Sequence, residues 1–91
     1  MTASRPHWFV YMLRCVDGTI YTGITNNVAA RLKKHNAGRG AKYTKQRTPV
    51  SLIFREKHPD QGSAMRRELQ IKKWSRLSKE KLAAKRTRRA T

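Results

Sequence analysis

The chain has 91 residues, enough for one small domain with a modest core, and 22 Lys and Arg against 5 Asp and Glu give a net charge of +17. This charge predicts a polyanionic partner, nucleic acid ahead of an anionic membrane, and no segment approaches the roughly 20 apolar residues of a membrane span. The single cysteine, Cys15, excludes an intrachain disulfide and a cysteine-based zinc site. Because no charged-then-apolar signal segment opens the chain, we expect a reducing, cytoplasmic location.

The first two predicted elements form a hairpin. Residues 8–15 and 19–24 are rich in aromatic, β-branched and other apolar side chains, which is typical of strands. The Asp17-Gly18 pair between them is a hairpin signal.

The loop length decides where the two hairpin tyrosines point. A two-residue loop would leave Tyr11 and Tyr21 on opposite faces of the sheet. A three-residue loop over residues 16–18 would pair Leu13 with Tyr21 and Tyr11 with Gly23, so that both tyrosines share a face. The sequence permits both registers, and we expect the second; ordinary sheet packing remains the alternative role for either tyrosine.

A helix is predicted next, followed by a basic loop. Asn26 or Asn27 is expected to cap a helix over residues 28–37, and Gly38 is a suitable residue for its C-terminal stop. Residues 38–48 hold basic side chains, two glycines and no acid, which indicates a loop.

The third strand is predicted over residues 50–56. Val50, Leu52 and Phe54 alternate along it, so we expect these three side chains to share one buried face.

Two helices are predicted in the last third of the chain. Ser63 is the expected cap of a helix over residues 64–75, and Ser78 of a short helix over residues 79–85. The basic tail, residues 86–91, is expected to be frayed.

This β-β-α-β-α-α order predicts an α+β fold, with a small, three-stranded, mostly antiparallel sheet flanked by helices. We expect a single domain over residues 1–91, with its core at about 8–77 and a basic C-terminal helix and tail at 78–91.

Glu68 is the carboxylate that needs an explanation. At about 100° per residue it falls in the middle of the apolar stripe of its helix. That stripe consists of Ala64, Met65, Leu69, Ile71 and Trp74. An ion pair with Lys72 would be the ordinary account. Because an unpaired buried charge is costly, the alternative is that Glu68 faces a cleft and binds a cation there.

Two polar residues stand out on the first helix. His35 shares an apolar stripe with Val28 and Leu32, and Arg31 lies on the rim of that stripe. A structural hydrogen bond would explain His35 alone equally well, and a solvated position is the usual explanation for Arg31 alone.

Together these residues resemble the GIY-YIG nuclease superfamily. Val10-Tyr11 stands for the end of the GIY motif and Tyr21-Thr22-Gly23 for YIG, followed by Arg31, His35 and a later helix with Glu68. The likeness runs from about Trp8 to Leu77. It is strongest to small stand-alone bacterial members, which are similar to the nuclease domains of UvrC and of Slx-type endonucleases.

The resemblance implies phosphodiester cleavage with one divalent cation, Mg²⁺ or Mn²⁺. It assigns Glu68 as the metal ligand and Arg31 as the contact to the scissile phosphate. It assigns Tyr21 to the attacking water, Tyr11 to a supporting position and His35 to a place beside the phosphate, as in some restriction enzymes. Two positions depart from the family pattern: Ile24 replaces a lysine of UvrC-type members, and Glu80 stands where many members have asparagine.

Further residues are predicted to contact nucleic acid. Gly23 would let a phosphate approach the strand closely, and Tyr43 could stack on a base. The basic contacts would be Arg39, Lys42, Lys45, Arg47 and Lys72. A merely solvated basic loop is the alternative for residues 38–48.

We therefore expect a metal-dependent DNA endonuclease, structure-selective or weakly sequence-specific, with DNA repair or recombination as candidate processes. DNA is expected ahead of RNA, and a partner protein could supply targeting, while the oligomeric state stays open. The rival expectation is a non-catalytic nucleic-acid-binding module that keeps the fold.

Overall fold

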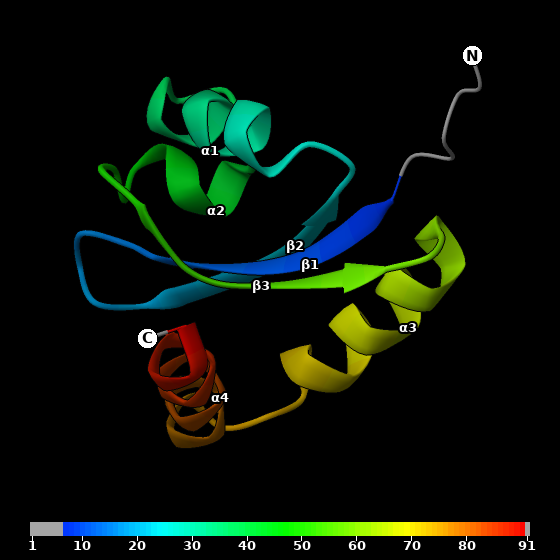
Figure 1. The fold of residues 1–91 in the computed structure, drawn as a ribbon. Coiled ribbons are helices and arrows are strands. Elements are labelled where there is room, and N and C mark those ends of the chain that lie inside the picture. The colour runs from blue at the N-terminus through cyan, green and yellow to red at the C-terminus, as the bar shows by residue number, and fades with distance from the viewer. Residues whose placement is uncertain (1–6, 91) are drawn as a thin grey trace, which may run out of the picture.

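The computed structural model describes residues 7–90, and of residues 86–90 only the backbone. The elements are β1 (Trp8–Arg14), β2 (Ile20–Thr25), α1 (Val28–Asn36), α2 (Lys42–Lys45), β3 (Ser51–His58), α3 (Gln61–Lys72) and α4 (Arg76–Ala90). The strands form one antiparallel sheet in the order β2-β1-β3, with α1 and α2 on one face and α3 and α4 on the other (Figure 1). The predicted α+β fold class is confirmed. Residues 1–6 and Thr91, which the predicted domain includes, lie outside the described residues.

The hairpin adopts the predicted register. Leu13 pairs with Tyr21 and Tyr11 with Gly23. Gly18 closes the loop with φ at +86°, a left-handed conformation that glycine adopts without strain. Both tyrosines therefore lie on the same face of the sheet.

The ends of α1 also agree with the sequence. Asn27 is the N-cap, and its side-chain oxygen accepts a 3.0 Å hydrogen bond from a first-turn N–H. Gly38 follows the helix with φ at +77°. Asn36 then bonds both backbone groups of Val50, at 3.0 and 2.7 Å, which fixes the start of β3 against α1. The predicted loop 38–48 contains the short helix α2, which the sequence reading missed.

A β-bulge at Ile53 changes the faces of β3. Val50 packs beside Tyr11 on the α1 side, Phe54 packs on the opposite face, and Leu52 is 36% exposed. The prediction that Val50, Leu52 and Phe54 share one buried face is wrong, because the extra residue breaks the alternation of side chains.

Both C-terminal helices begin earlier than predicted. Asp60 caps α3 by accepting a 2.8 Å hydrogen bond from the N–H of Ser63. Ser75 caps α4 in the same way, accepting a 3.2 Å hydrogen bond from the N–H of Ser78. The two predicted caps are therefore wrong: each serine is the donor three residues inside its helix. The backbone of α4 is helical through Ala90, so this helix takes in most of the segment predicted to be frayed.

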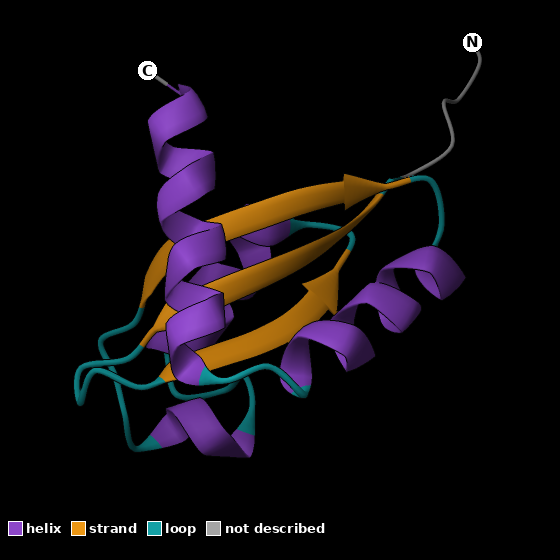
Figure 2. Cartoon of the chain, turned by 90° about the horizontal axis from the view of Figure 1, so that it is seen from below, coloured by secondary structure: helices purple, strands orange, loops and turns teal. Residues whose placement is uncertain are grey.

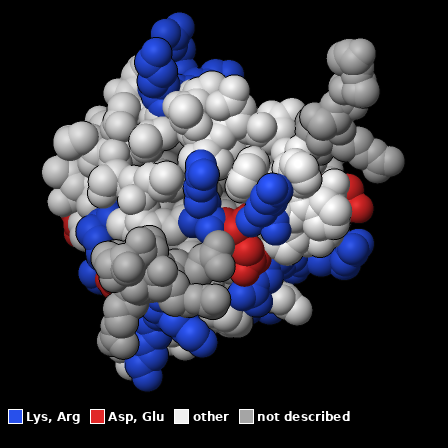
Figure 3. Space-filling view, in the orientation of Figure 1, with Lys and Arg blue, Asp and Glu red and all other residues white. Residues whose placement is uncertain are grey.

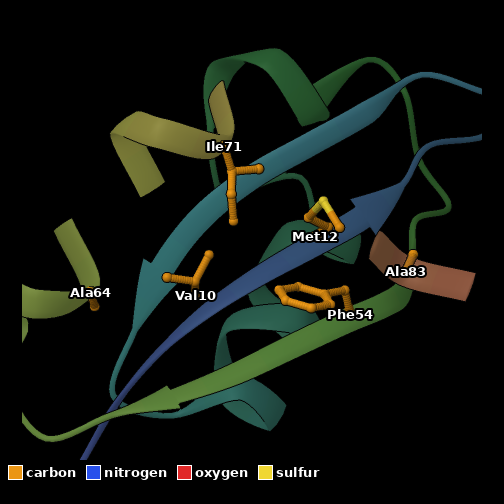
Figure 4. Close-up of a cluster of buried hydrophobic side chains, with 6 residues drawn as sticks. All are labelled: Val10, Met12, Phe54, Ala64, Ile71 and Ala83. Atoms are coloured by element: carbon orange, nitrogen blue, oxygen red, sulfur yellow. The ribbon is translucent and has the colours of Figure 1, made fainter. Parts of the chain in front are cut away.

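The sheet separates two buried clusters. Between the sheet and the helices α3 and α4 lies an apolar cluster of Val10, Met12, Phe54, Ala64, Ile71 and Ala83 (Figure 4). The second cluster, on the α1 side, consists of Tyr11, Leu13, Cys15 and Val50. Seen from below, α4 crosses the strands while α3 lies beside β2 (Figure 2). Among the described residues, no helix has the length and apolar character that a membrane crossing requires.

Candidate active site

Tyr11 lies at the centre of the α1-facing side of the sheet. Its ring is 2% exposed, and its hydroxyl lies 2.9 Å from Nε2 of His35. The Nε of Arg31 donates a longer hydrogen bond, 3.4 Å, to the same hydroxyl. Burial raises the pKa of Tyr11, so the phenol stays protonated at neutral pH.

Gly23 provides the room that this phenol occupies. A Cβ at Gly23 would lie 2.7 Å from the Tyr11 hydroxyl oxygen and 3.1 Å from a ring carbon of Tyr21. The missing side chain therefore serves cross-strand packing of Tyr11. This corrects the expectation that Gly23 leaves space for a phosphate.

His35 supports Tyr11 from the interior of the protein. Its side chain is 0% exposed, and its Nδ1 lies 2.7 Å from Oγ1 of Thr44. Gly40 packs directly on it, since a Cβ there would lie 2.6 Å from Cγ of His35. Burial, and then the charge of Arg31, lower the pKa of His35, which keeps the imidazole neutral. Both ring nitrogens are bonded inside the protein, so His35 does not reach a phosphate, contrary to the expectation from the resemblance.

Tyr21 and Arg31 complete this part of the site. The Tyr21 ring centroid is 6.3 Å from that of Tyr11 and 5.2 Å from that of His35. The hydrogen bond to Tyr11, followed by the nearby Tyr21 phenol, raises the pKa of Arg31, so its guanidinium is always charged. Tyr21 is half-buried, and its phenol is more open than that of Tyr11.

Glu68 approaches the same group from α3. Its side chain is 17% exposed, and its Oε2 lies 3.3 Å from Nζ of Lys72. Its negative charge is close enough to raise the pKa of Tyr11. Met65 and Leu69 are 46% and 57% exposed, so Glu68 lies at the edge of the buried stripe of α3. The sequence had predicted a position in the middle of that stripe, and this prediction is wrong. The ion pair with Lys72, the ordinary account that the sequence allowed for Glu68, is therefore present.

The other four acidic residues have structural partners. Asp17 bonds Thr19 and Arg47, Glu56 bonds His58 and Arg67, Asp60 caps α3, and Glu80 bonds Arg14 and Arg76. Glu68 is the acid that acts on the Tyr11 phenol, and its partner Lys72 is a long side chain that is 47% exposed. Two phenols and a guanidinium thus lie together, and the Glu68 carboxylate on α3 is within electrostatic range of the Tyr11 phenol.

Comparison with known proteins agrees with this arrangement. The family model described as the GIY-YIG catalytic domain matches residues 7–82 of the chain. The chain belongs to the GIY-YIG family. The resemblance seen in the sequence is therefore confirmed, and the family is one of nucleases, whose substrates are nucleic acids.

Similar proteins within this family span nearly the same length. A UPF0213 protein of Streptococcus sanguinis is 49% identical over 82 residues, covering 90% of this chain and 94% of that protein. A UPF0213 protein of Natronomonas pharaonis is 51% identical over 79 residues, covering 87% and 93%. The solution NMR structure of a UPF0213 protein from Bacillus halodurans is 45% identical, with a TM-score of 0.56 over 86% of this chain and 83% of that one. The solution NMR structure of a protein from E. faecalis is 35% identical, with a TM-score of 0.61 over 92% of this chain and 90% of that one.

The donor set at Glu68 fits a hard divalent cation that is shared with a substrate. Among the described residues, no group of three or more His, Cys, Asp and Glu could hold a metal ion by itself. One carboxylate, together with waters and a substrate phosphate, is a normal arrangement for Mg²⁺. Lys72 would have to turn away from the Glu68 carboxylate, and its exposed, flexible side chain can do so.

The two departures from the GIY-YIG pattern have structural explanations. Ile24 pairs with Val10 and packs against the apolar cluster, so its side chain points away from Tyr11. Glu80 accepts two hydrogen bonds from Arg14, at 2.6 and 2.8 Å, which holds α4 to the sheet. These bonds lower the pKa of Glu80 to about 2. Neither residue takes part in the site around Tyr11.

The predicted aromatic and basic contacts of the loop 38–48 divide into two groups. Arg39, Lys42 and Lys45 are exposed, as a nucleic-acid contact requires. Tyr43 is 40% exposed, but its ring stacks on Tyr21 at 6.0 Å and lies 4.1 Å from the guanidinium carbon of Arg47.

Arg47 differs from the other basic residues of this segment. Its Nε donates to a carboxylate oxygen of Asp17 at 3.0 Å, and its Nη1 donates to the carbonyl of Tyr43 at 2.8 Å. Arg47 therefore joins α2 to the hairpin loop, and its contact to a nucleic-acid backbone stays a prediction. On the face seen in Figure 3, lysine and arginine atoms project at several separate places, with small acidic patches among them.

Sequence reasoning missed two residues that hold the site. Thr44 and Gly40 both contact His35. Both residues lie in the segment 38–48, which was predicted to be a solvated loop. The helix α2 in this segment is only four residues long, too short to be recognised from the sequence. A small residue at position 40 and a hydroxyl at 44, within reach of a buried histidine, were the available signal.

Proposed function

We propose that this chain is a metal-dependent endonuclease that hydrolyses phosphodiester bonds of DNA. The observation that carries the proposal is the group of Tyr11, Tyr21 and Arg31, in which Arg31 donates a 3.4 Å hydrogen bond to Tyr11 and the tyrosine ring centroids lie 6.3 Å apart. The Glu68 carboxylate on α3 lies within electrostatic range of the Tyr11 phenol. Phosphodiester hydrolysis needs an oriented water, neutralised phosphate charge and a stabilised leaving oxygen. A module that only binds phosphates has no use for a carboxylate at this position.

Each residue of the site has a role in this reaction. Arg31 presents a planar, permanently charged fork to the phosphate oxygens. Tyr21, the more open phenol, orients the attacking water, since a phenol is a weak base at neutral pH. Tyr11 and His35 hold Arg31 in place through hydrogen bonds. Bound at Glu68, Mg²⁺ or Mn²⁺ would polarise the phosphate and make the water more acidic.

The substrate would be held mainly through its backbone. Arg39, Lys42 and Lys45 are exposed near the site, and Lys72 becomes free for a phosphate once a cation takes its place at Glu68. The short α2 offers no recognition helix for base edges, which favours selection of a DNA structure, or weak sequence specificity, over sequence readout. The proposal includes action in DNA repair or recombination, targeting by a partner protein, and a reducing cytoplasmic location, in line with the buried free thiol of Cys15.

A nicking assay tests the proposal. With Mg²⁺ or Mn²⁺, the wild-type protein should cleave branched, single-stranded or duplex DNA. Glu68→Gln should slow cleavage by about 10²–10³-fold with little change in binding, because the cation loses its protein ligand. Glu80→Gln is the control, since it removes an ion-paired carboxylate of α4 that takes no part in the site around Tyr11 and should leave the rate unchanged.

The rival function is a non-catalytic nucleic-acid-binding module, which the net charge of +17 favours. Equal, background-level cleavage by wild type and Glu68→Gln on all DNA substrates, with tight and salt-dependent binding, would support that module and reject the hydrolase. RNA of the same structure forms a separate arm of the assay. Cleavage of RNA alone would show that the substrate is RNA and not DNA.

A further inference from the structure

A continuous line of hydrogen bonds runs from α2 to Arg31. Thr44 is 0% exposed, and its Oγ1 lies 3.1 Å from the carbonyl oxygen of Ala41 and 2.7 Å from Nδ1 of His35. The other ring nitrogen of His35 lies 2.9 Å from the Tyr11 hydroxyl, which in turn lies 3.4 Å from Nε of Arg31. Four contacts thus link a backbone carbonyl to a guanidinium.

The Thr44 end of this line fixes its direction. Thr44 has one hydroxyl proton, and a carbonyl can only accept a hydrogen bond. With that proton donated to Ala41, the contact between Thr44 and His35 needs a proton on Nδ1, and the neutral ring then has its acceptor at Nε2. Tyr11 donates to Nε2 of His35, and Nδ1–H of His35 donates to Thr44. Every proton in the line then has an acceptor.

The opposite tautomer of His35 leaves a buried proton without an acceptor. With the proton on Nε2, the ring would donate to Tyr11, and Nδ1 would need the hydroxyl proton of Thr44. Thr44 would then no longer donate to the Ala41 carbonyl, which still accepts from the N–H groups of Thr44 and Lys45. The larger cost is at Tyr11, whose proton would lose its acceptor at a site that is 2% exposed. In that tautomer Nδ1 could accept from the N–H of Ala41, but at 3.5 Å this contact is too weak to offset the loss at Tyr11.

We propose that Thr44 is a positioning residue that holds His35 in the Nδ1–H tautomer and thereby orients Tyr11 and Arg31. The Tyr11 oxygen is left with its lone pairs toward the guanidinium, because its own proton is committed to His35. Arg31 is thus held at its Nε. The consequence for cleavage rests on the proposed nuclease function, whereas the tautomer does not.

Nitrogen NMR of ¹⁵N-labelled protein at neutral pH measures the tautomer directly. We expect the Nδ1 of His35 to give the shift of a protonated ring nitrogen and Nε2 that of an unprotonated one. Thr44→Ser, which keeps the hydroxyl, should preserve this pattern. Thr44→Val, which replaces the hydroxyl by a methyl group, should shift the His35 signals toward the Nε2–H tautomer or a mixture.

Thr22→Val is the matched control. Thr22 is 2% exposed, and its Oγ1 has no hydrogen-bond partner among the described residues, so the same substitution there should leave the His35 signals unchanged. In the cleavage assay, Thr44→Val should lower kcat about 10- to 100-fold at similar KM, while Thr44→Ser and Thr22→Val stay near wild type.

The outcomes separate this inference from the function. An Nε2–H tautomer in the wild type overturns the inference whatever the cleavage rate, and it needs no variant to fold. Unchanged His35 signals in folded Thr44→Val overturn it as well. Wild-type protein with the Nδ1–H tautomer, a response of the tautomer to Thr44→Val and no cleavage would retain the inference and reject the nuclease proposal.

Discussion

The two faces of the sheet are stabilised by different interactions. Behind β1, Val10 and Met12 meet Ile71 and Phe54 in an apolar cluster, where burial of hydrocarbon surface is the main stabilising contribution. On the other side of β1, Tyr11, His35 and Thr44 form a polar network in which the groups are joined by specific hydrogen bonds. An apolar cluster tolerates changes of shape, but a buried polar network loses its function when one partner is removed.

Helix α3 connects these two faces. It packs by Ala64 and Ile71 on the apolar face, and it also carries Glu68, whose charge acts on the Tyr11 phenol. The candidate metal ligand is therefore positioned by hydrophobic packing, and its partners by hydrogen bonds. Stability and activity should separate when the two faces are changed one at a time.

The largest expected change in stability is at Ile71, in the apolar cluster. Ile71 is 0% exposed, so Ile71→Ala should lower the free energy of unfolding by about 2–5 kcal/mol through lost burial and a cavity. Denaturant titration measures this loss. Leu69→Ala, on the same helix but 57% exposed, should change stability by less than about 0.5 kcal/mol. Similar losses for the two variants would contradict the assignment of the apolar face.

A smaller loss is expected from packing on the polar face. In Gly40→Ala the new Cβ would meet Cγ of His35 at 2.6 Å and its Cα at 2.9 Å, so helix backbone or ring must move. We expect a loss of about 1–3 kcal/mol from overpacking, together with shifted His35 NMR signals.

Gly62→Ala provides the control for this substitution. Gly62 lies in α3, where the nearest atoms to a new Cβ are 3.5 and 3.6 Å away. That variant should be neutral, or more stable by up to about 1 kcal/mol, because alanine favours a helix. A stable Gly40→Ala protein with wild-type His35 signals would show that the polar face is less tightly packed than described.

The side of the sheet that binds nucleic acid can be identified from salt dependence. Replacing Lys42 and Lys45 of α2 by Gln should reduce the slope of log K against log salt concentration by up to about 0.9 per lysine, if each contacts a phosphate. The same replacement at Lys81 and Lys85 of α4, which are also exposed, should leave the slope unchanged. Fluorescence anisotropy at several salt concentrations measures both slopes. An equal reduction for the two pairs would assign binding to overall charge and not to the α1-facing side.

The sequence predicted the parts of this structure that depend on neighbouring residues. The hairpin register follows from the loop length and from Gly18, and the limits of α1 from Asn27 and Gly38. Tyr11, Tyr21, Arg31 and Glu68 were singled out through the resemblance to the GIY-YIG family, and the first three lie together in the structure.

The wrong predictions concern features that tertiary contacts determine, such as which side chains are buried. A run of apolar residues in β3 gives no sign of the bulge at Ile53, and periodicity alone cannot show that Met65 and Leu69 of α3 stay uncovered. The burial of His35 depends on Gly40 and Thr44, which are close to it only after the segment 38–48 folds back. The two N-caps were also predicted wrongly. Ser63 and Ser78 each lie three residues after the residue that caps the helix, which is Asp60 in α3 and Ser75 in α4.

The smallest expected effect concerns the ion pair that holds α4 to the sheet. The hydrogen bonds from Arg14 lower the pKa of Glu80 from 4.5 to about 2, so the folded state favours the charged carboxylate. Its contribution to stability is complete above about pH 4.5 and is lost as the pH falls toward about 2. Glu80→Gln should therefore be less stable than wild type at neutral pH, and the difference should shrink to zero across that interval. Because the carboxylate is 31% exposed, added salt should also weaken the difference. Thermal unfolding of both proteins from pH 7 to pH 2 measures it, and two curves that stay parallel over the whole range would show that this pair does not anchor α4.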